Sequence, residues 1–69
     1  MREWLKSKRL EKGMTMKDMG EKLGISESYY SMIESGERQK KMDLTLVAGL
    51  SVALGVSIAE IVAYDTEGS

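Results

Sequence analysis

The sequence has no cysteine, histidine, proline or phenylalanine among its 69 residues. The absence of cysteine excludes a disulfide framework and fits a reducing compartment, and without histidine as well the usual zinc ligand sets cannot be assembled. A chain of this length forms one small domain, whose marginal core needs well-packed helices or association between copies. We expect one domain over residues 1–65, a C-terminal tail over residues 66–69, and neither a metal nor a cofactor.

Long hydrophobic runs and a secretory signal are also missing. The stretch "LTLVAGLSVALGVSIA" at 44–59 carries no charge, but a membrane-spanning helix needs about 20 apolar residues and rarely contains a Gly-Val-Ser break. The opening "MREWLKSKRLEK" is charged throughout and lacks the apolar segment of a secretory signal. The sequence therefore predicts a cytoplasmic protein without a membrane partner.

Neither sign of charge dominates, because the net charge is -1, but the charges are unevenly distributed. The first twelve residues hold five basic and two acidic groups, whereas residues 44–69 hold three acidic groups and no basic one. A second basic cluster, Arg38, Lys40 and Lys41, lies within residues 35–43. This asymmetry says more about where an anionic partner would bind than the total charge does.

Three triplets of glycine, an apolar residue and a hydroxyl residue recur along the chain, namely "GMT" at 13–15, "GIS" at 24–26 and "GVS" at 55–57. Glycine tolerates the left-handed conformation that closes a helix, and Ser or Thr two positions later can accept from the free N–H groups of the next helix. Asp18 and Glu60 follow two of these hydroxyls at capping-box spacing. Gly36 and Asp43 supply a further helix end and start.

These signals predict five helices and no strand. The helices are expected at about 2–12, 16–23, 27–35, 44–54 and 58–63. Apolar residues recur at helical spacing in the second and fourth of them; these residues are Met16, Met19 and Leu23, and Leu44, Val47, Leu50 and Leu54. The connections are short, the longest being 36–42, so the fold class is a compact all-α five-helix bundle.

Only Gly24, Ile25 and Ser26 connect the second and third helices. So short a turn makes the two helices cross steeply, which is helix-turn-helix geometry over about 16–35. A helical wheel of 27–35 separates two faces. Tyr29, Tyr30 and Ile33 are expected to face inward, and Ser28, Ser31, Met32 and Ser35 outward, with Glu27 beside them.

The chain resembles the phage-repressor or Cro-type (xenobiotic-response-element) family of helix-turn-helix transcriptional regulators. The resemblance extends from "LKSKRLEKGMT" through "EKLGISESYYSMIESGER" to "ALGVSIAEIV". It implies a lambda-repressor-like DNA-binding domain, with the third helix in the major groove and two subunits on half-sites about one helical turn apart. The chain departs from the family in having Met16 in place of Gln, Gly20 in place of Ala, and a longer loop at 36–43 without proline.

By this resemblance, the base-reading positions are Glu27, Ser28 and Met32, with Tyr29 at the boundary of the set, where it could contact a base edge or a phosphate. A carboxylate can accept from the cytosine amino group, a hydroxyl can serve either partner, and a thioether can pack on a thymine methyl. The alternative interpretation is that Glu27 only complements the positive end of the helix and that Ser28 is a solvated surface residue.

Because the third helix has no basic residue, phosphate contacts are expected from its surroundings. The N–H groups at the start of the second helix can bind a phosphate, and the cations of the following loop can bind others. The residues assigned to phosphate are Thr15, Met16, Lys17, Ser35, Arg38, Lys40 and Lys41. Each of these cations is equally compatible with an ordinary solvated side chain.

Two structural sets complete the predicted site residues. Glu34 lies at the margin of the buried face, where a lone carboxylate would be costly, and the family resemblance pairs it with Arg9. Two independent surface charges are the alternative. The C-terminal segment has more apolar surface than one short helix needs, so a homodimer interface is assigned there. Its residues are Ile58, Ile61, Val62 and Tyr64.

The absence of histidine, cysteine and a glycine-rich phosphate loop argues against an enzyme, and no small-molecule ligand is evident. We interpret the sequence as a prokaryotic or phage-encoded, nucleoid-associated regulator that binds specific double-stranded DNA as a homodimer at a palindromic operator. Repression is implied by the resemblance alone. The alternative is an antitoxin-like or adaptor module that uses this fold to bind a protein, which the acidic C-terminal third favours.

Overall fold

Four of the five helices are directly preceded by a residue whose side chain caps the helix. The computed structural model describes residues 1–68, and the side chains of residues 1–66. Over that range the elements are α1 (Glu3–Glu11), α2 (Met16–Leu23), α3 (Glu27–Ser35), α4 (Leu44–Leu54) and α5 (Ile58–Gly68), with no strand among them. The predicted all-α class and the order of five helices are confirmed.

The cap of α2 is the capping box expected from the sequence. The Thr15 hydroxyl accepts from the Asp18 N–H at 3.0 Å, and the Asp18 carboxylate accepts from the Thr15 N–H at 2.9 Å. This second hydrogen bond holds the pKa of Asp18 below its usual value. Ser26, Asp43 and Ser57 likewise accept from the first turns of α3, α4 and α5.

The last helix is longer than predicted. The sequence indicated an end near residue 63 and a tail over 66–69, but α5 continues to Gly68; residue 69 lies outside the described range. Tyr64 and Asp65, in the added turns, contact α1 through a ring stack with Trp4 and an ion pair with Arg2. These tertiary contacts stabilise turns that have no local helix signal of their own.

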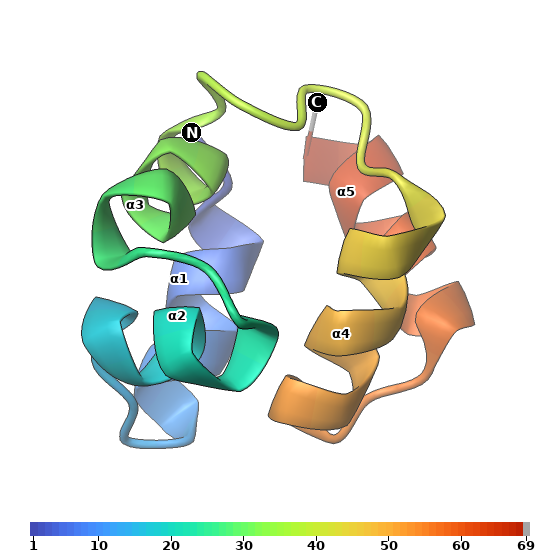
Figure 1. Ribbon diagram of the computed structural model, residues 1–69. Helices are drawn as coiled ribbons and strands as arrows, with labels where there is room; N and C mark the ends of the chain where they lie inside the picture. The colour runs from blue at the N-terminus through green and yellow to red at the C-terminus, as the bar shows by residue number, and fades with distance from the viewer. Residues whose placement is uncertain (69) are drawn as a thin grey trace.

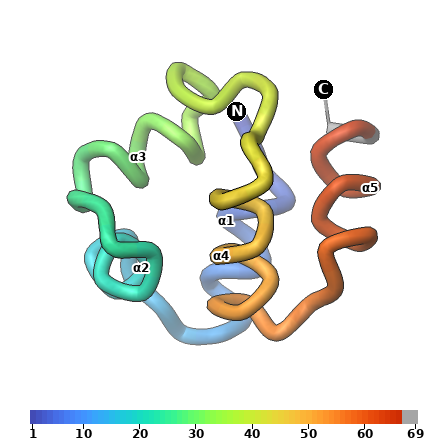
Figure 2. Tube along the Cα trace, turned by 45° about the vertical axis from the view of Figure 1, so that its right-hand side comes forward, coloured from blue at the N-terminus to red at the C-terminus, as the bar shows by residue number. Residues whose placement is uncertain are grey.

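The helices form two groups joined by the loop 36–43, as Figure 1 shows. α2 and α3 pack against each other, α1 contacts both α3 and α5, and α4 lies between α2 and α5. Figure 2 shows that the chain starts, and α5 ends, on the side of the molecule where this loop lies. The start of α1 and the end of α5 therefore lie near the segment that follows α3.

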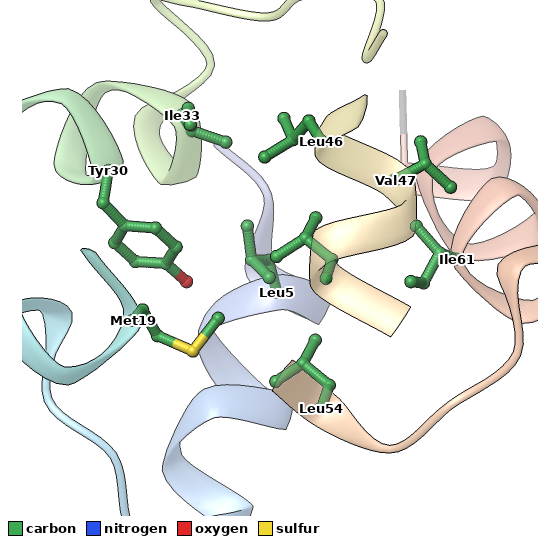
Figure 3. Close-up of a cluster of buried hydrophobic side chains, with 9 residues drawn as sticks. Leu5, Met19, Tyr30, Ile33, Leu46, Val47, Leu54 and Ile61 are labelled. Carbon is green, nitrogen blue, oxygen red and sulfur yellow. The ribbon is translucent and has the colours of Figure 1, made fainter. Parts of the chain in front are cut away.

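One core unites all five helices (Figure 3). Helix α3 contributes Tyr30 and Ile33, both fully buried. The complete set is Leu5, Met19, Tyr30, Ile33, Leu46, Val47, Leu50, Leu54 and Ile61. Because α3 supplies two of these residues, its inward face is fixed by packing and its opposite face is left to solvent.

No helix in residues 1–68 is both long and apolar enough to cross a membrane. Helix α4 and residues 58–66 of α5 meet the length and hydropathy criteria only together, and they are bent by 111° at the break between them. The uncharged stretch 44–59 is thus divided by the turn at Gly55.

Candidate nucleic-acid interface

The turn between α2 and α3 is closed by direct contact between backbones. Gly24 adopts the left-handed conformation with φ of 72°, and the Ile25 N–H donates to the Gly20 carbonyl at 2.9 Å. A Cβ atom at Gly20 would lie 2.9 Å from the Ile25 carbonyl oxygen and 3.3 Å from the Glu27 nitrogen. The absence of a side chain at Gly20 therefore allows α3 to approach α2 this closely.

Helix α3 presents two distinct faces. Tyr30, Ile33 and Glu34 are buried, whereas Glu27, Ser28 and Ser35 are exposed. Met32 and Ser31 lie between these extremes. Three of the four residues assigned to base reading, Glu27, Ser28 and Met32, thus have solvent-accessible side chains on the outward part of the helix.

Tyr29 is turned away from the other three. Its hydroxyl accepts from the Gln39 side-chain amide at 3.0 Å. Its ring lines a surface groove of about 360 Å³ whose other walls include Leu23 of α2 and Leu46 of α4. A phenol engaged in this way belongs to the seam between α3 and the following loop.

Arg9 and Glu34 form a buried two-point ion pair. The Arg9 Nε atom is 3.0 Å from Glu34 Oε2, and its Nη2 atom is 3.2 Å from Glu34 Oε1. The third donor, Nη1, reaches the Met14 carbonyl at 2.9 Å. Glu34 raises the pKa of Arg9, so the guanidinium stays charged at any accessible pH. The pair ties α1 and the turn before α2 to the inner side of α3.

Tyr30 lies beside this pair but does not complete it. Its ring is fully buried, and its hydroxyl has no hydrogen-bond partner within the described residues. Burial, followed by the neighbouring Glu34 carboxylate, raises the pKa of Tyr30 far above its ordinary value. The phenol is therefore neutral and contributes through packing.

The residues assigned to phosphate contacts lie at the start of α2, at the last residue of α3 and in the loop that follows it. Thr15 is held in the capping box, and half-buried Met16 and exposed Lys17 form the first turn of α2, where backbone N–H groups give the helix its positive end. At the last residue of α3, the Ser35 hydroxyl donates to the Met32 carbonyl at 3.0 Å. The exposed loop cations complete the set; they are Arg38, Lys40 and Lys41.

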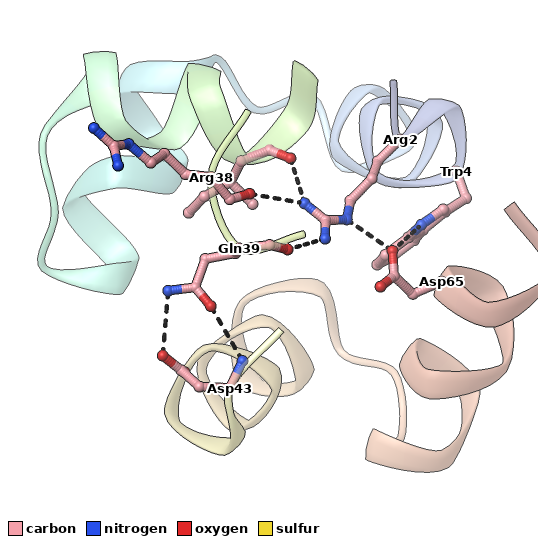
Figure 4. A network of polar contacts seen from close by, with 7 residues as sticks. Arg2, Trp4, Arg38, Gln39, Asp43 and Asp65 are labelled. Atoms are coloured by element: carbon pink, nitrogen blue, oxygen red, sulfur yellow. Dashed lines mark hydrogen bonds and ion pairs between the residues drawn. The ribbon is translucent and has the colours of Figure 1, made fainter. Parts of the chain in front are cut away.

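Three residues that the sequence interpretation missed organise this loop (Figure 4). Arg2 is 7% exposed and donates to the carbonyls of Ile33, Arg38 and Gln39. Its Nε atom is paired with Asp65 of α5 at 2.7 Å. Gln39 in turn donates to Asp43 at 3.2 Å. A local sequence signal for Arg2 does not exist, because most of its acceptors are backbone carbonyls far along the chain.

The family of the chain follows from its sequence match. A model of the helix-turn-helix family matches residues 5–61. The chain belongs to this family. Its members are DNA-binding transcriptional regulators of the Cro/C1 type rather than a class of enzymes.

One similar protein is the uncharacterized HTH-type transcriptional regulator YqaF of Bacillus subtilis (strain 168). It is 49% identical over 39 residues, which represent 56% of this chain and 51% of the relative. The chain thus spans about half the length of that relative. No solved structure matches this helix-turn-helix chain.

The residues assigned to a dimer interface in this helix-turn-helix domain divide into two groups. Ile61 is fully buried in the core of its own protomer, so its assignment to an interface was wrong. Tyr64 stacks on Trp4 with ring centroids 5.7 Å apart, beneath the Lys8 ammonium. Ile58 and Val62 are 44% and 51% exposed and are the two members that present apolar surface to solvent.

The helix-turn-helix domain has no evident metal site over the range that the structure describes. No group of three or more carboxylate, histidine or cysteine side chains within it is arranged to hold a cation. Side chains on the outward face of α3 can form hydrogen bonds and apolar contacts. The segments around this face supply fixed positive charge.

Proposed function

We propose that this chain binds specific double-stranded DNA sequences through α3 in the major groove. The observation that carries the proposal is the outward face of α3, which is exposed and free of cations at a fixed angle to α2. Base edges are read by hydroxyl, carboxylate and apolar groups, and phosphates are bound by positive charge. The outward face of α3 carries groups of the first kind without a cation, and the segments around it carry the positive charge.

The proposed reading residues are Glu27, Ser28 and Met32. The proposed phosphate contacts are the first turn of α2 on one side and Arg38, Lys40 and Lys41 on the other. Glu27 sits in the first turn of α3, where its carboxylate complements the positive helix end, and a cytosine amino group would be its partner on DNA.

We also propose that two copies bind together and that the outcome is repression. A single small domain of this kind covers one half-site, so specificity over a full operator needs two. The exposed apolar side chains of Ile58 and Val62 on α5 support association through this helix. Repression and a location inside the cell follow from the family resemblance and from DNA as the partner.

Selection of bound sequences from random duplex DNA tests the proposal directly. A recovered palindrome with half-sites about one turn apart is the expected result. Recovery of no preferred sequence, together with an affinity that does not fall with salt, would exclude DNA as the ligand and favour the alternative of a protein-binding module.

Variants then separate reading from positioning. Lys40→Ala with Lys41→Ala should weaken binding to all sequences alike and reduce the salt slope by about 1 for each phosphate that the variant no longer neutralises. Ser28→Ala should change preference at particular base pairs and leave the salt slope unchanged. Identical behaviour of the two variants would contradict the assignment of these roles.

A further inference from the structure

The C-terminal end of α3 is capped by a residue from the start of the chain. Helix α3 has no basic residue in its last turn, although free carbonyl groups there favour positive charge. Arg2 supplies that charge. Its backbone N–H donates to the Glu34 carbonyl at 2.8 Å, and its Nη1 atom donates to the Ile33 carbonyl at 2.6 Å.

The same guanidinium holds the loop that follows α3. Arg2 Nη1 also donates to the Arg38 carbonyl at 3.3 Å, and Nη2 donates to the Gln39 carbonyl. Gln39, with φ of 53°, extends the network, because its side chain bonds Tyr29 at 3.0 Å and the Asp43 N–H at 3.1 Å. The loop backbone is thus tied to α3, to the start of α4 and to α1.

Asp65 fixes the guanidinium itself. Its Oδ1 atom accepts from Arg2 Nε at 2.7 Å and from Trp4 Nε1 at 3.3 Å. Arg2 is therefore held between α5 and the loop, and being 7% exposed it is not placed to contact a phosphate. The cations beside it are different, because Arg38, Lys40 and Lys41 are exposed. The backbone is held at the Arg38 and Gln39 carbonyls before the two lysines and at the Asp43 N–H after them.

We propose that Arg2 is a positioning residue for phosphate binding, which orders the loop 38–43 so that its exposed cations are arranged before DNA arrives. The inference rests on the proposed DNA-binding function. A loop that is already ordered does not lose its conformational freedom on binding, so its contacts are stronger than those of a free loop. The effect is independent of sequence, because phosphates carry no sequence information.

Arg2→Gln removes the charge and most of the donors, and Lys12→Gln makes the same charge change at an exposed position in the turn that follows α1. Affinity for a mixed-sequence DNA duplex is measured over a range of salt, at a temperature where circular dichroism shows every variant folded. We expect Arg2→Gln to bind about tenfold more weakly with a smaller salt slope, and Lys12→Gln to stay within about threefold of wild type. Amide exchange over residues 38–43 should accelerate in Arg2→Gln alone.

Gln39→Gly keeps the test open if Arg2→Gln does not fold. Glycine suits the positive φ at this position, and the change removes the ties to Tyr29 and Asp43 while leaving the carbonyl that Arg2 binds. Faster loop exchange with weaker, less salt-dependent binding is expected again. Unchanged affinity and salt slope in a folded Arg2→Gln variant would overturn the role of Arg2, as would unchanged loop exchange. In Gln39→Gly, faster loop exchange with unchanged affinity would show that order in this loop does not strengthen phosphate binding, which overturns the proposal as well. Absence of DNA binding by the wild type would instead overturn the proposed function.

Discussion

At the scale of single residues, the energetics of α3 depend on a carboxylate that is almost completely removed from water. Glu34 is 1% exposed, and its two oxygens both meet Arg9. A buried pair contributes little net stability relative to apolar residues, but removal of one partner strands the other charge. The arrangement is therefore more sensitive to single than to double replacement.

Arg9→Met and Glu34→Leu should each lower the free energy of unfolding by about 3 to 5 kcal/mol, a large part of the stability of so small a domain. The double variant should recover part of that loss, although the Met14 carbonyl also loses its donor. Urea melts of the two single variants and the double variant measure the coupling free energy between Arg9 and Glu34. Small and additive effects would contradict the importance of burial here.

Tyr30→Phe should have the opposite effect on the free energy of unfolding. The Tyr30 hydroxyl is buried without a hydrogen bond among the described residues, so its desolvation is not offset. Deleting it should leave stability unchanged or raise it by about 1 kcal/mol, as measured by urea melts. A loss comparable to that of Arg9→Met would mean that the phenol hydrogen-bonds the ion pair in solution.

Sequence reasoning found the residues whose signals are periodic or typical of the family. The helical wheel placed Tyr30 inward and Glu34 at its margin, and the resemblance supplied Arg9. It missed Arg2 because a cation that binds carbonyl groups leaves no pattern of residue types. The hydrogen bond between Gln39 and the Tyr29 hydroxyl was not predictable either, because it depends on the loop conformation at Gln39.

At the scale of the elements, two helical glycines should respond differently to the same substitution. A Cβ at Gly49 would meet only the end of the half-buried Leu23 side chain, at 2.8 Å, and that side chain can move aside. Gly49→Ala should therefore raise stability by about 0.5 to 1 kcal/mol through helix propensity.

Gly20→Ala gains the same propensity but meets the Ile25 carbonyl, which belongs to the turn itself. Overpacking against backbone costs about 1 to 3 kcal/mol, so the net effect should be a loss of about 1 kcal/mol. Thermal melts of the two variants give the comparison. Equal stabilisation by Gly49→Ala and Gly20→Ala would show that the turn between α2 and α3 accommodates the added methyl group at little cost.

Helix boundaries were predictable where a glycine or a capping side chain marks them. The starts of α2, α3, α4 and α5 coincide with the cap residues Thr15, Ser26, Asp43 and Ser57. The end of α5 was not predictable, because it is set by contacts of Tyr64 and Asp65 with α1. Such contacts become visible only when both ends of the chain are placed in space.

At the scale of the whole molecule, the protomer closes its own core. Its accessible surface of 4302 Å² equals the value of about 4300 Å² expected for a folded monomer of this mass. Ile61 is consumed by that core, so association between copies has to use the side chains left outside, notably Val62. The proposed dimer would then be an addition to the fold and not a condition for it.

Val62→Asp should weaken self-association while leaving the thermal melt of the monomer within about 0.5 kcal/mol of wild type. Ile61→Asp should instead unfold the protomer, because it buries an unpaired charge. Val52→Asp, at a position 86% exposed on α4, controls for the added charge. Sedimentation measures the self-association of the three variants. Equal association of Val62→Asp and wild type would exclude this part of α5 as the interface.

The ion pair between Arg2 and Asp65 joins residues separated by 63 positions. The arginine that holds the loop is therefore synthesised 63 residues before its carboxylate partner. Helices α1 to α4 can assemble on the nascent chain, but the loop after α3 acquires its full set of contacts only once α5 has emerged. Asp65→Asn would leave the core residue Ile61 and the helix-turn-helix in place and weaken the hold of α5 on Arg2, because the carboxylate that fixes the guanidinium against the loop loses its charge.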